Sequence, residues 1–210
     1  MPVGILDYGI GNVGSILSMH VKLDIEAVRV STVADLEGCE RIILPGVGAF
    51  EEGIRRLRQS GMFELLEELV LVKKVPILGI CLGMQMLASS SWEGTQMEDG
   101  LGWIPGEVRP LRGLVADDVK VPIMGWAYVT EKRDSGLFNG VTEKQRFYFV
   151  HSYAFFPQDA KDLVATVDYG CPVSAIVARG NVIGTQFHPE KSHRFGMSLL
   201  KQFSVWESIS

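Results

Sequence analysis

The sequence predicts an α/β fold: a single domain with a largely parallel central sheet, flanked by helices, and with additional antiparallel strands in its second half. In the first half, short apolar runs alternate with longer segments of helical period, a pattern typical of parallel strands joined by helical crossovers. In the second half, strand-like runs follow one another with Gly, Pro, Asn and Asp between them. The 210 residues, 47% of them hydrophobic, are enough for one substantial core. We therefore expect one domain over residues 1–210.

The first half is expected to form strands and covering helices in alternation. Apolar residues at helical spacing predict helices over Gly14–Leu23 and Glu51–Val72, the second broken near Ser60 and Gly61, since glycine and serine favour turns. The short apolar runs between these helices predict strands over Val3–Leu6, Ala27–Val30, Arg41–Leu44 and Pro76–Ile80.

The second half is expected to contain mostly strands and to end in a helix over His193–Trp206. No repeat or Pro/Ser-rich linker separates the halves, so we expect both to share one sheet. The predicted strands are Glu107–Leu111, Val121–Val129, Arg146–Val150, Leu163–Val167, Val173–Val177 and Val182–Phe187.

Composition excludes several classes of function. The net charge of −5, with scattered Lys and Arg, gives no basic footprint for nucleic acid. The three cysteines form neither a disulfide framework nor a CxxC metal site, and Cys39 and Cys171 are expected to pack as small hydrophobes. The N-terminus lacks a signal sequence, and Lys73 and Lys74 interrupt the most apolar central stretch. We expect a soluble cytoplasmic protein with no metal, organic cofactor, nucleic-acid partner or membrane contact.

Cys81 is the strongest candidate for a nucleophile. Residues 75–91 read VPILGICLGMQMLASSS, which is a buried strand, a Gly-x-Cys-x-Gly turn and a helical run. This is the nucleophile-elbow pattern, in which glycines flank a side chain held on a strained turn between a strand and a helix. The backbone N–H of Leu82 would then be placed to bind an oxyanion that forms on a carbonyl attacked by Cys81.

A nucleophilic cysteine needs a base, and two of the four histidines are candidates. His151 and His188 each follow a strand-like run directly, which places them at the edge of a sheet where α/β sites form. His188 is the better base because Glu190, two residues on, can orient its imidazole. His20 and His193 are expected to be surface or packing residues. The resulting hypothesis is a catalytic triad of Cys81, His188 and Glu190.

Three separated blocks of the sequence resemble the class I, triad-type glutamine amidotransferases. The blocks are Pro45-Gly46-Val47-Gly48, Gly79-Ile80-Cys81-Leu82-Gly83-Met84-Gln85 and Gln186-Phe187-His188-Pro189-Glu190-Lys191-Ser192. Within that class the chain most resembles the glutaminase subunits of imidazole glycerol phosphate synthase. This resemblance extends over essentially the whole chain, through DYGIGN, ILPGVGAF, GLGWIPGEV and FYFVHSY.

The resemblance implies a role for each matching residue. Cys81 would be the nucleophile, His188 the general acid and base, and Glu190 its orienting group. Backbone N–H groups of an oxyanion hole would come from Val47, Gly48 and Leu82. Groups that hold glutamine would come from Gly46, Gly48, Gln85, Glu93, His151, Ser152 and Tyr153. The residues implied at a partner interface are Asn12, Trp126, Tyr148 and Lys191.

The resemblance also implies a reaction and a partner. Glutamine would be hydrolysed to glutamate and ammonia, and the ammonia would pass to a (β/α)₈-barrel cyclase subunit in a heterodimer. That cyclase would use it to form imidazole glycerol phosphate and aminoimidazole carboxamide ribotide in histidine biosynthesis. Activation of the glutaminase by the cyclase would act through the loop that begins at Pro45. No further domain is expected on this chain.

One departure from the family keeps a second pathway open. The family usually has asparagine after Met-Gly-Trp, on an interfacial loop, and this chain has Ala127. With the Ser192–Gly196 stretch, Ala127 favours the alternative of a paralogous glutaminase, which supplies ammonia to a cyclase-like partner for amidino sugars of surface polysaccharides.

Three readings outside this family are weaker. A cysteine peptidase with histidine directly after the nucleophile is disfavoured by Leu82. A catalytically inert binding module would require a missing triad member, and all three are present. The Gly9-x-Gly11-x-x-Gly14 pattern formally matches a dinucleotide fingerprint, but no acidic residue ends the strand over Ala27–Val30.

Overall fold

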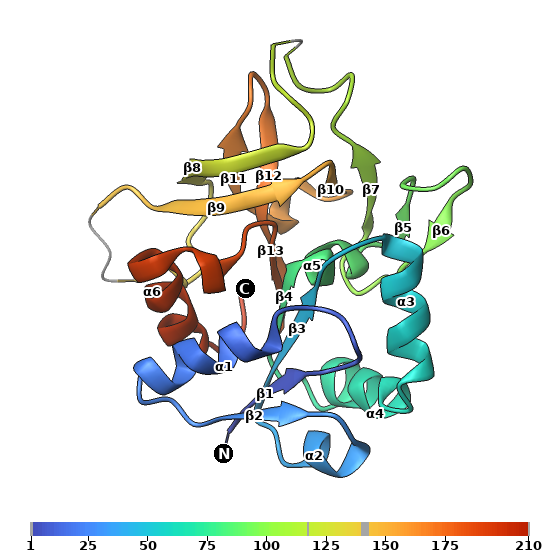
Figure 1. Ribbon diagram of the computed structural model, residues 1–210, viewed down its shortest axis with the longest axis vertical. Coiled ribbons are helices and arrows are strands. Elements are labelled where there is room, and N and C mark those ends of the chain that lie inside the picture. The colour runs from blue at the N-terminus through green and yellow to red at the C-terminus, as the bar shows by residue number, and fades with distance from the viewer. Residues whose placement is uncertain (1, 117, 140–142, 210) are drawn as a thin grey trace.

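The computed structural model describes residues 2–116, 118–139 and 143–209, and its largest element is a central mixed sheet. The strands lie in the order β2-β1-β3-β4-β13-β12-β11-β8-β9 (Figure 1). Neighbours from β2 to β13 pair in parallel, whereas those from β13 to β9 pair antiparallel. The strands are β1 Val3–Leu6, β2 Ala27–Val30, β3 Arg41–Gly46, β4 Ile77–Cys81, β8 Ile123–Glu131, β9 Arg146–His151, β11 Leu163–Asp168, β12 Pro172–Arg179 and β13 Val182–Thr185. The predicted α/β fold is confirmed.

Helices cover both faces of the parallel part of this sheet. They are α1 Val13–Lys22, α2 Val33–Glu37, α3 Phe50–Gln59, α4 Phe63–Glu67, the π-helical turn η1 Glu68–Val72, α5 Leu82–Met86 and α6 His193–Phe203. The helical stretch predicted over Glu51–Val72 is interrupted at Ser60–Met62, close to the expected break. The five-residue helix α2 is an element that the sequence pattern does not predict.

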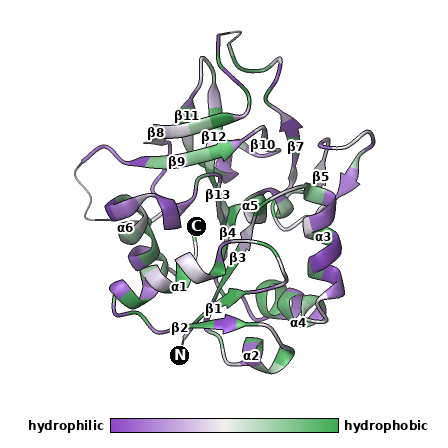
Figure 2. Ribbon diagram, in the orientation of Figure 1, coloured by the Kyte–Doolittle hydropathy of each residue, from purple (hydrophilic) through white to green (hydrophobic). Residues whose placement is uncertain are grey.

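Alternation along the strands divides the apolar side chains between two cores. On β1, Ile5 packs with α1 and α6, whereas Leu6 points to the opposite face and packs with α3 and α5. Helix α3 shows the matching helical pattern, with Phe50, Ile54 and Leu57 buried and charged residues outside. Figure 2 shows the resulting polar outer side of α3 and the apolar central strands.

A second, smaller sheet lies beside the first. It has the order β10-β7-β5-β6, with β5 Ser90–Ser91, β6 Glu98–Asp99, β7 Gly106–Pro110 and β10 Tyr153–Pro157. Strands of both halves share the nine-stranded sheet, as expected, but the strand predicted over Glu107–Leu111 lies in the second sheet as β7. The reason is its pairing: β7 lies antiparallel to β10 and parallel to β5, and Arg109 and Pro110 at its end are exposed.

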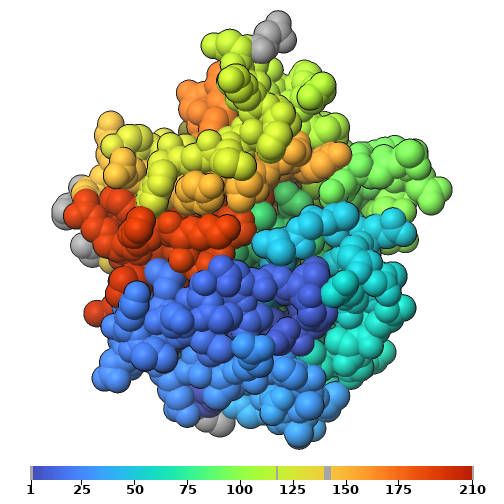
Figure 3. Space-filling model, viewed as in Figure 1, coloured from blue at the N-terminus to red at the C-terminus, as the bar shows by residue number. Residues whose placement is uncertain are grey.

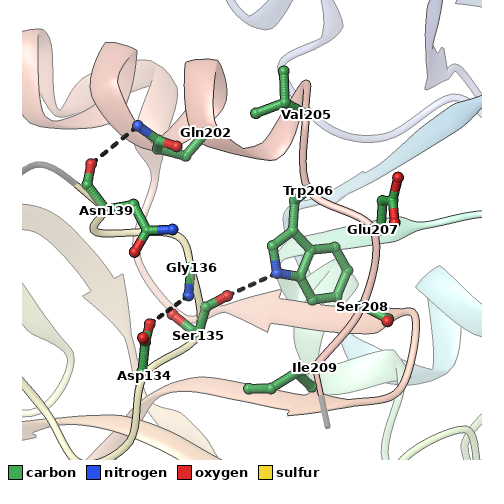
Figure 4. A pocket seen from close by; sticks show the side chains of 10 residues that line it. All are labelled: Asp134, Ser135, Gly136, Asn139, Gln202, Val205, Trp206, Glu207, Ser208 and Ile209. Atoms are coloured by element: carbon green, nitrogen blue, oxygen red, sulfur yellow. Dashed lines mark hydrogen bonds between the residues drawn. The ribbon is translucent and has the colours of Figure 1, made fainter.

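The last helix returns the chain to the first half. Figure 3 shows the second half above the first, with α6 lying beside α1. Near the end of α6, the Gln202 side chain donates to the carbonyl of Asn139 (3.1 Å). Just after α6, the Trp206 indole donates to the carbonyl of Ser135 (2.8 Å). A hollow of about 470 Å³ lies between the segment around Ser135 and the C-terminal segment around Trp206 (Figure 4). In residues 2–116, 118–139 and 143–209, every helix is too short or too polar to cross a bilayer.

Candidate active site

Cys81 lies at the sharp turn where β4 passes into α5. Its backbone has φ of 55° and ψ of −108°, a conformation that non-glycine residues rarely adopt. A side chain at Gly83 would overlap the carbonyl oxygen of Leu44, and a Cβ at Gly79 would lie 2.7 Å from the carbonyl carbon of Gly83. The two glycines therefore allow α5 to pack directly on β3 and β4, which presents Cys81 at the carboxyl edge of the sheet.

His188 reaches the same edge because β13 pairs with β4, and Thr185 lies opposite Ile80. Its Nδ1 lies 2.8 Å from Oε1 of Glu190, and both side chains are only 2% exposed. A carboxylate can only accept a hydrogen bond, so Nδ1 carries a hydrogen and Nε2 is the nitrogen that remains for chemistry.

The pKa of His188 reflects this environment. Burial alone would lower the pKa, but hydrogen bonding and charge from Cys81 and Glu190 outweigh burial and raise it to about 9. Nε2 has no hydrogen-bond partner of normal geometry among the described residues. The ring is therefore protonated at neutral pH and can give its Nε2 proton to a group that enters the cavity.

A cavity of about 270 Å³ joins these groups, a size suited to a small molecule. Cys81 and His188 line it together with most residues expected at the glutamine site. The lining consists of Val47, Gly48, Cys81, Leu82, Gln85, Glu93, Val150, His151, Ser152, Tyr153 and His188. Gly46 does not line the cavity, because it packs against α5, where a Cβ would lie 2.7 Å from the nitrogen of Gly83.

His151 borders the same cavity but differs from His188 in its protonation state. Its Nδ1 lies 2.8 Å from the carbonyl oxygen of Tyr153, so Nδ1 must donate and Nε2 bears a lone pair. Burial lowers the pKa of His151 to about 4, against a smaller opposing effect of the Tyr153 hydrogen bond. His151 is therefore neutral at physiological pH and only weakly basic.

Glu93 links the cavity wall to the start of α3. One carboxylate oxygen accepts from the backbone N–H of Phe50 (2.9 Å), and the Tyr153 hydroxyl donates to the Glu93 carbonyl (3.2 Å). Burial raises the pKa of Glu93, with the Phe50 hydrogen bond acting in the opposite direction. Glu93 thus supplies an acidic group at one end of the cavity.

Three residues that support the site were missed by sequence reasoning. The Tyr8 hydroxyl donates to the Pro45 carbonyl (2.6 Å), which fixes the loop that leads to Val47 and Gly48. The Ser192 hydroxyl donates to the His188 carbonyl (2.6 Å). Gln186 donates to Sγ of Cys81 (3.9 Å). All three lie within segments that resemble the family, Tyr8 in DYGIGN and Gln186 and Ser192 in the block around His188, and this was the available signal.

The residues expected at a partner interface lie on several elements, and the 3₁₀ turn Pro189–Lys191 packs against α1. Asn12 accepts from the N–H of Ser15 (3.4 Å) and so caps α1. Trp126 and Tyr148 form an edge-to-face pair with centroids 6.3 Å apart, and the Lys191 ammonium lies 5.9 Å from the Tyr148 ring centre.

Ala127 lies in strand β8 rather than on a loop. Its half-buried side chain packs against the core, whereas neighbouring Met124, Trp126 and Tyr128 are exposed. Replacement of the family's usual asparagine therefore changes the inner side of this strand, and not its exposed aromatic face.

The described residues contain no group of three or more His, Cys, Asp or Glu that could hold a metal ion. The hollow near the C-terminal segment has no cysteine or histidine among the described residues that line it. Of these two places, only the cavity at Cys81 is lined by a cysteine and by histidines.

Comparisons with known proteins agree on one family. The family profile described as "Glutamine amidotransferase class-I" matches residues 5–205. The chain is 46% identical to imidazole glycerol phosphate synthase subunit HisH 2 of Pseudomonas aeruginosa, over 95% of this chain and 96% of that protein. It is 49% identical to subunit HisH of Bdellovibrio bacteriovorus, over 96% and 98%.

Solved structures agree on the fold. A crystal structure of a glutamine amidotransferase superimposes with a TM-score of 0.74 at 20% identity, over 97% of each chain. PurLQS from Thermotoga maritima gives a TM-score of 0.72 at 20% identity, over 96% of each chain. These distant structures share the fold, and the profile and close relatives establish membership. The chain belongs to the class I glutamine amidotransferase family.

Proposed function

We propose that this chain is the glutaminase subunit of an imidazole glycerol phosphate synthase, with Cys81, His188 and Glu190 as its catalytic triad. The observation that carries the proposal is one cavity in which Cys81 faces His188, while Glu190 holds the far side of the imidazole at 2.8 Å. The two close relatives named above support the choice of pathway.

The geometry supports a two-stage hydrolysis. The thiolate of Cys81 attacks the carboxamide carbon of glutamine, and negative charge on the oxygen is stabilised by the N–H groups of Leu82 and of the Val47–Gly48 loop. His188 gives its Nε2 proton to the departing nitrogen, which leaves as ammonia. Water then attacks the thioester, His188 takes a proton from this water, and glutamate is released.

Acceptor groups in the cavity suit the amino-acid end of glutamine. Glu93 presents a carboxylate, and Gln85 lies one helical turn beyond Cys81 on α5. A carboxylate placed in this way favours an ammonium group over a neutral one, because charge-assisted hydrogen bonds are the stronger kind. We therefore assign recognition of the α-ammonium group of glutamine to Glu93.

The ammonia must reach an acceptor before water protonates it, so a partner is part of the proposal. We propose a (β/α)₈-barrel cyclase, bound in a heterodimer through Asn12, Trp126, Tyr148 and Lys191. The exposed Trp126 is linked to the proposed site through two strands. Its strand β8 pairs with β9, and the backbone N–H of His188 donates to the carbonyl of Tyr148 on β9 (2.9 Å). Cytoplasmic location is part of this proposal.

The test measures glutamate released by the chain alone, with the histidine-pathway cyclase of the same organism, and with that cyclase plus its nucleotide substrate. We expect the cyclase together with its nucleotide to stimulate glutamate release strongly, and we expect no such stimulation in Cys81→Ala. Activity that depends on Cys81 but ignores this cyclase would instead support the second candidate. Absence of Cys81-dependent hydrolysis with any partner would refute the glutaminase assignment.

The second candidate has the same chemistry and a different acceptor. Ala127 stands where the family usually has asparagine, in β8, the strand that carries Trp126, and this departure from the family is the observation that favours a different partner. The partner is then a cyclase-like enzyme that makes amidino sugars of surface polysaccharides. The two candidates are distinguished by which of the two cyclases binds the chain and stimulates it.

A further inference from the structure

A chain of side-chain amides connects the sulfur of Cys81 to the wall of the cavity. Gln186 Nε2 lies 3.9 Å from Cys81 Sγ, and Gln186 Oε1 accepts from Gln85 Nε2 at 3.0 Å. Gln85 Nε2 also donates to the carbonyl of Tyr153 at 3.1 Å. Gln186 is fully buried and Gln85 is 5% exposed, so these contacts do not compete with bulk water.

The polarity of this chain is determined at the Tyr153 carbonyl. A carbonyl oxygen only accepts, so Gln85 must turn its NH₂ group toward it. The second hydrogen of the same NH₂ group then meets the oxygen of Gln186, which leaves the NH₂ group of Gln186 facing Cys81. An amide turned the other way would place two oxygens together in a buried site, which is costly.

The backbone holds Gln186 in register with the nucleophile. Its N–H donates to the carbonyl of Ala175 on β12 (2.9 Å), directly after β13 has ended at Thr185. The side chain therefore starts from a rigid sheet edge and approaches Cys81 from the side of β13, along the same segment that carries His188.

We propose that Gln186 is a positioning residue, oriented by Gln85 and the Tyr153 carbonyl, that donates an N–H to the sulfur of Cys81 and holds it ready for attack. This inference rests on the proposed glutaminase function for its purpose, but the contact to the sulfur can be tested without glutamine. A donor that faces the sulfur stabilises negative charge on it, and hydrogen bonds to charged groups are the stronger ones.

The test is alkylation of Cys81 by iodoacetamide as a function of pH, quantified on the peptide that carries Cys81. Gln186→Met removes the donor at similar volume, and Gln186→Glu keeps the shape but replaces the donor by an oxygen. Both are expected to slow alkylation at pH 7 roughly tenfold and to move its pH profile to higher pH. His188, His151 and Glu93, which also face the cavity, are unchanged in both variants. Gln186→Glu adds a carboxyl group beside the sulfur, so Gln186→Met is the decisive variant.

The orientation by Gln85 gives a second, independent measurement. Gln85→Met does not touch the sulfur but frees Gln186, so it is expected to move the alkylation profile in the same direction. The double variant should be no slower than Gln186→Met alone, because both changes break one chain of contacts. Gln202→Met, on α6, is the matched control and should leave the profile unchanged.

The outcomes separate the two proposals. In glutamine hydrolysis, Gln186→Met should lower kcat about tenfold with little change in KM, since Gln186 does not line the cavity. An unchanged alkylation profile in a folded Gln186→Met or Gln186→Glu variant, or fully additive effects in the double variant, would overturn the positioning role. A shifted profile in a protein that never hydrolyses glutamine would leave the positioning role intact and refute the proposed function.

Discussion

His188 and His151 line one cavity and differ in almost every property that matters for acid–base chemistry. Each uses Nδ1 in a hydrogen bond of 2.8 Å, but the acceptor is a carboxylate for His188 and a backbone carbonyl for His151. The pKa of His188 is about 9, and that of His151 is about 4. A difference of one acceptor and one neighbouring thiol therefore decides which imidazole is charged at neutral pH.

Burial acts on both rings in the same direction, toward the neutral form. Only for His188 do hydrogen bonding and charge from Cys81 and Glu190 outweigh burial and raise the pKa. The protonated His188 in turn lowers the pKa of His151, in addition to the effect of burial. The comparison teaches that catalytic identity here comes from the partners of an imidazole and not from its place at the edge of the sheet.

The largest expected effect comes from removing the charged histidine. His188→Asn should lower kcat for glutamine hydrolysis by about 10³-fold or more, because both proton transfers lose their carrier. The measurement is glutamate release under stimulation by the partner. His151→Asn is the matched variant in the same cavity. Similar losses in the two variants would contradict the assignment of His188 as the base.

Replacing the partner of His188 should have the next largest effect. Glu190→Gln keeps the shape and removes the charge, so the pKa of His188 should fall from about 9 and kcat should fall by roughly 10²-fold. The ring pKa can be followed by NMR titration of the His188 ring protons. The pKa of His151 serves as the internal control and should move little, since Glu190 does not contact it.

The proposed triad could be inferred from the sequence because each of its parts has a local signal. The glycines around Cys81 indicate a strained turn, and Glu190 stands two residues from His188 in the sequence. Even so, the sequence left His151 as a second candidate base. Its rejection needed the Tyr153 carbonyl and the extent of burial, which are properties of the packed structure.

Other parts of the site could not be predicted because their contacts join distant segments. Tyr8 and Pro45 are 37 residues apart, and Gln186 and Cys81 are 105 apart.

The fold likewise divides into elements that have a local signal and elements that depend on distant contacts. The parallel strands from β1 to β4 follow the predicted runs within two residues at each end, because each is a local apolar run. Assignment of β7 to a second sheet depends on its pairing with β10, which no local pattern specifies.

Stability should change with pH in opposite windows for the two histidines. The raised pKa of His188 contributes stability that is complete below about pH 6.5 and is lost as pH rises through 9. The lowered pKa of His151 contributes stability that is complete above about pH 6.5 and is lost as pH falls through 4. Each contribution changes by at most about 1.4 kcal/mol per pH unit.

Denaturant unfolding of the two asparagine variants between pH 4 and pH 9 measures these contributions. His151→Asn should remove part of the loss of stability on the acid side, whereas His188→Asn should remove part of the loss on the alkaline side. If both variants change the same side, the assigned pKa directions are wrong for one of the rings.

The smallest effect is expected on catalysis by His151→Asn. Because His151 is neutral and its Nε2 carries a lone pair toward the cavity, it can offer a bound molecule one hydrogen-bond acceptor and no proton. A neutral hydrogen bond contributes about 0.5–1.5 kcal/mol, so KM for glutamine should rise by roughly two- to tenfold, with kcat nearly unchanged. Steady-state kinetics at pH 7 and pH 8 should give the same ratio of variant to wild type, since His151 does not titrate in this range. A ratio that changes between these two pH values would mean that His151 exchanges protons during turnover, and the division of labour between the two rings would then be less complete than their pKa values indicate.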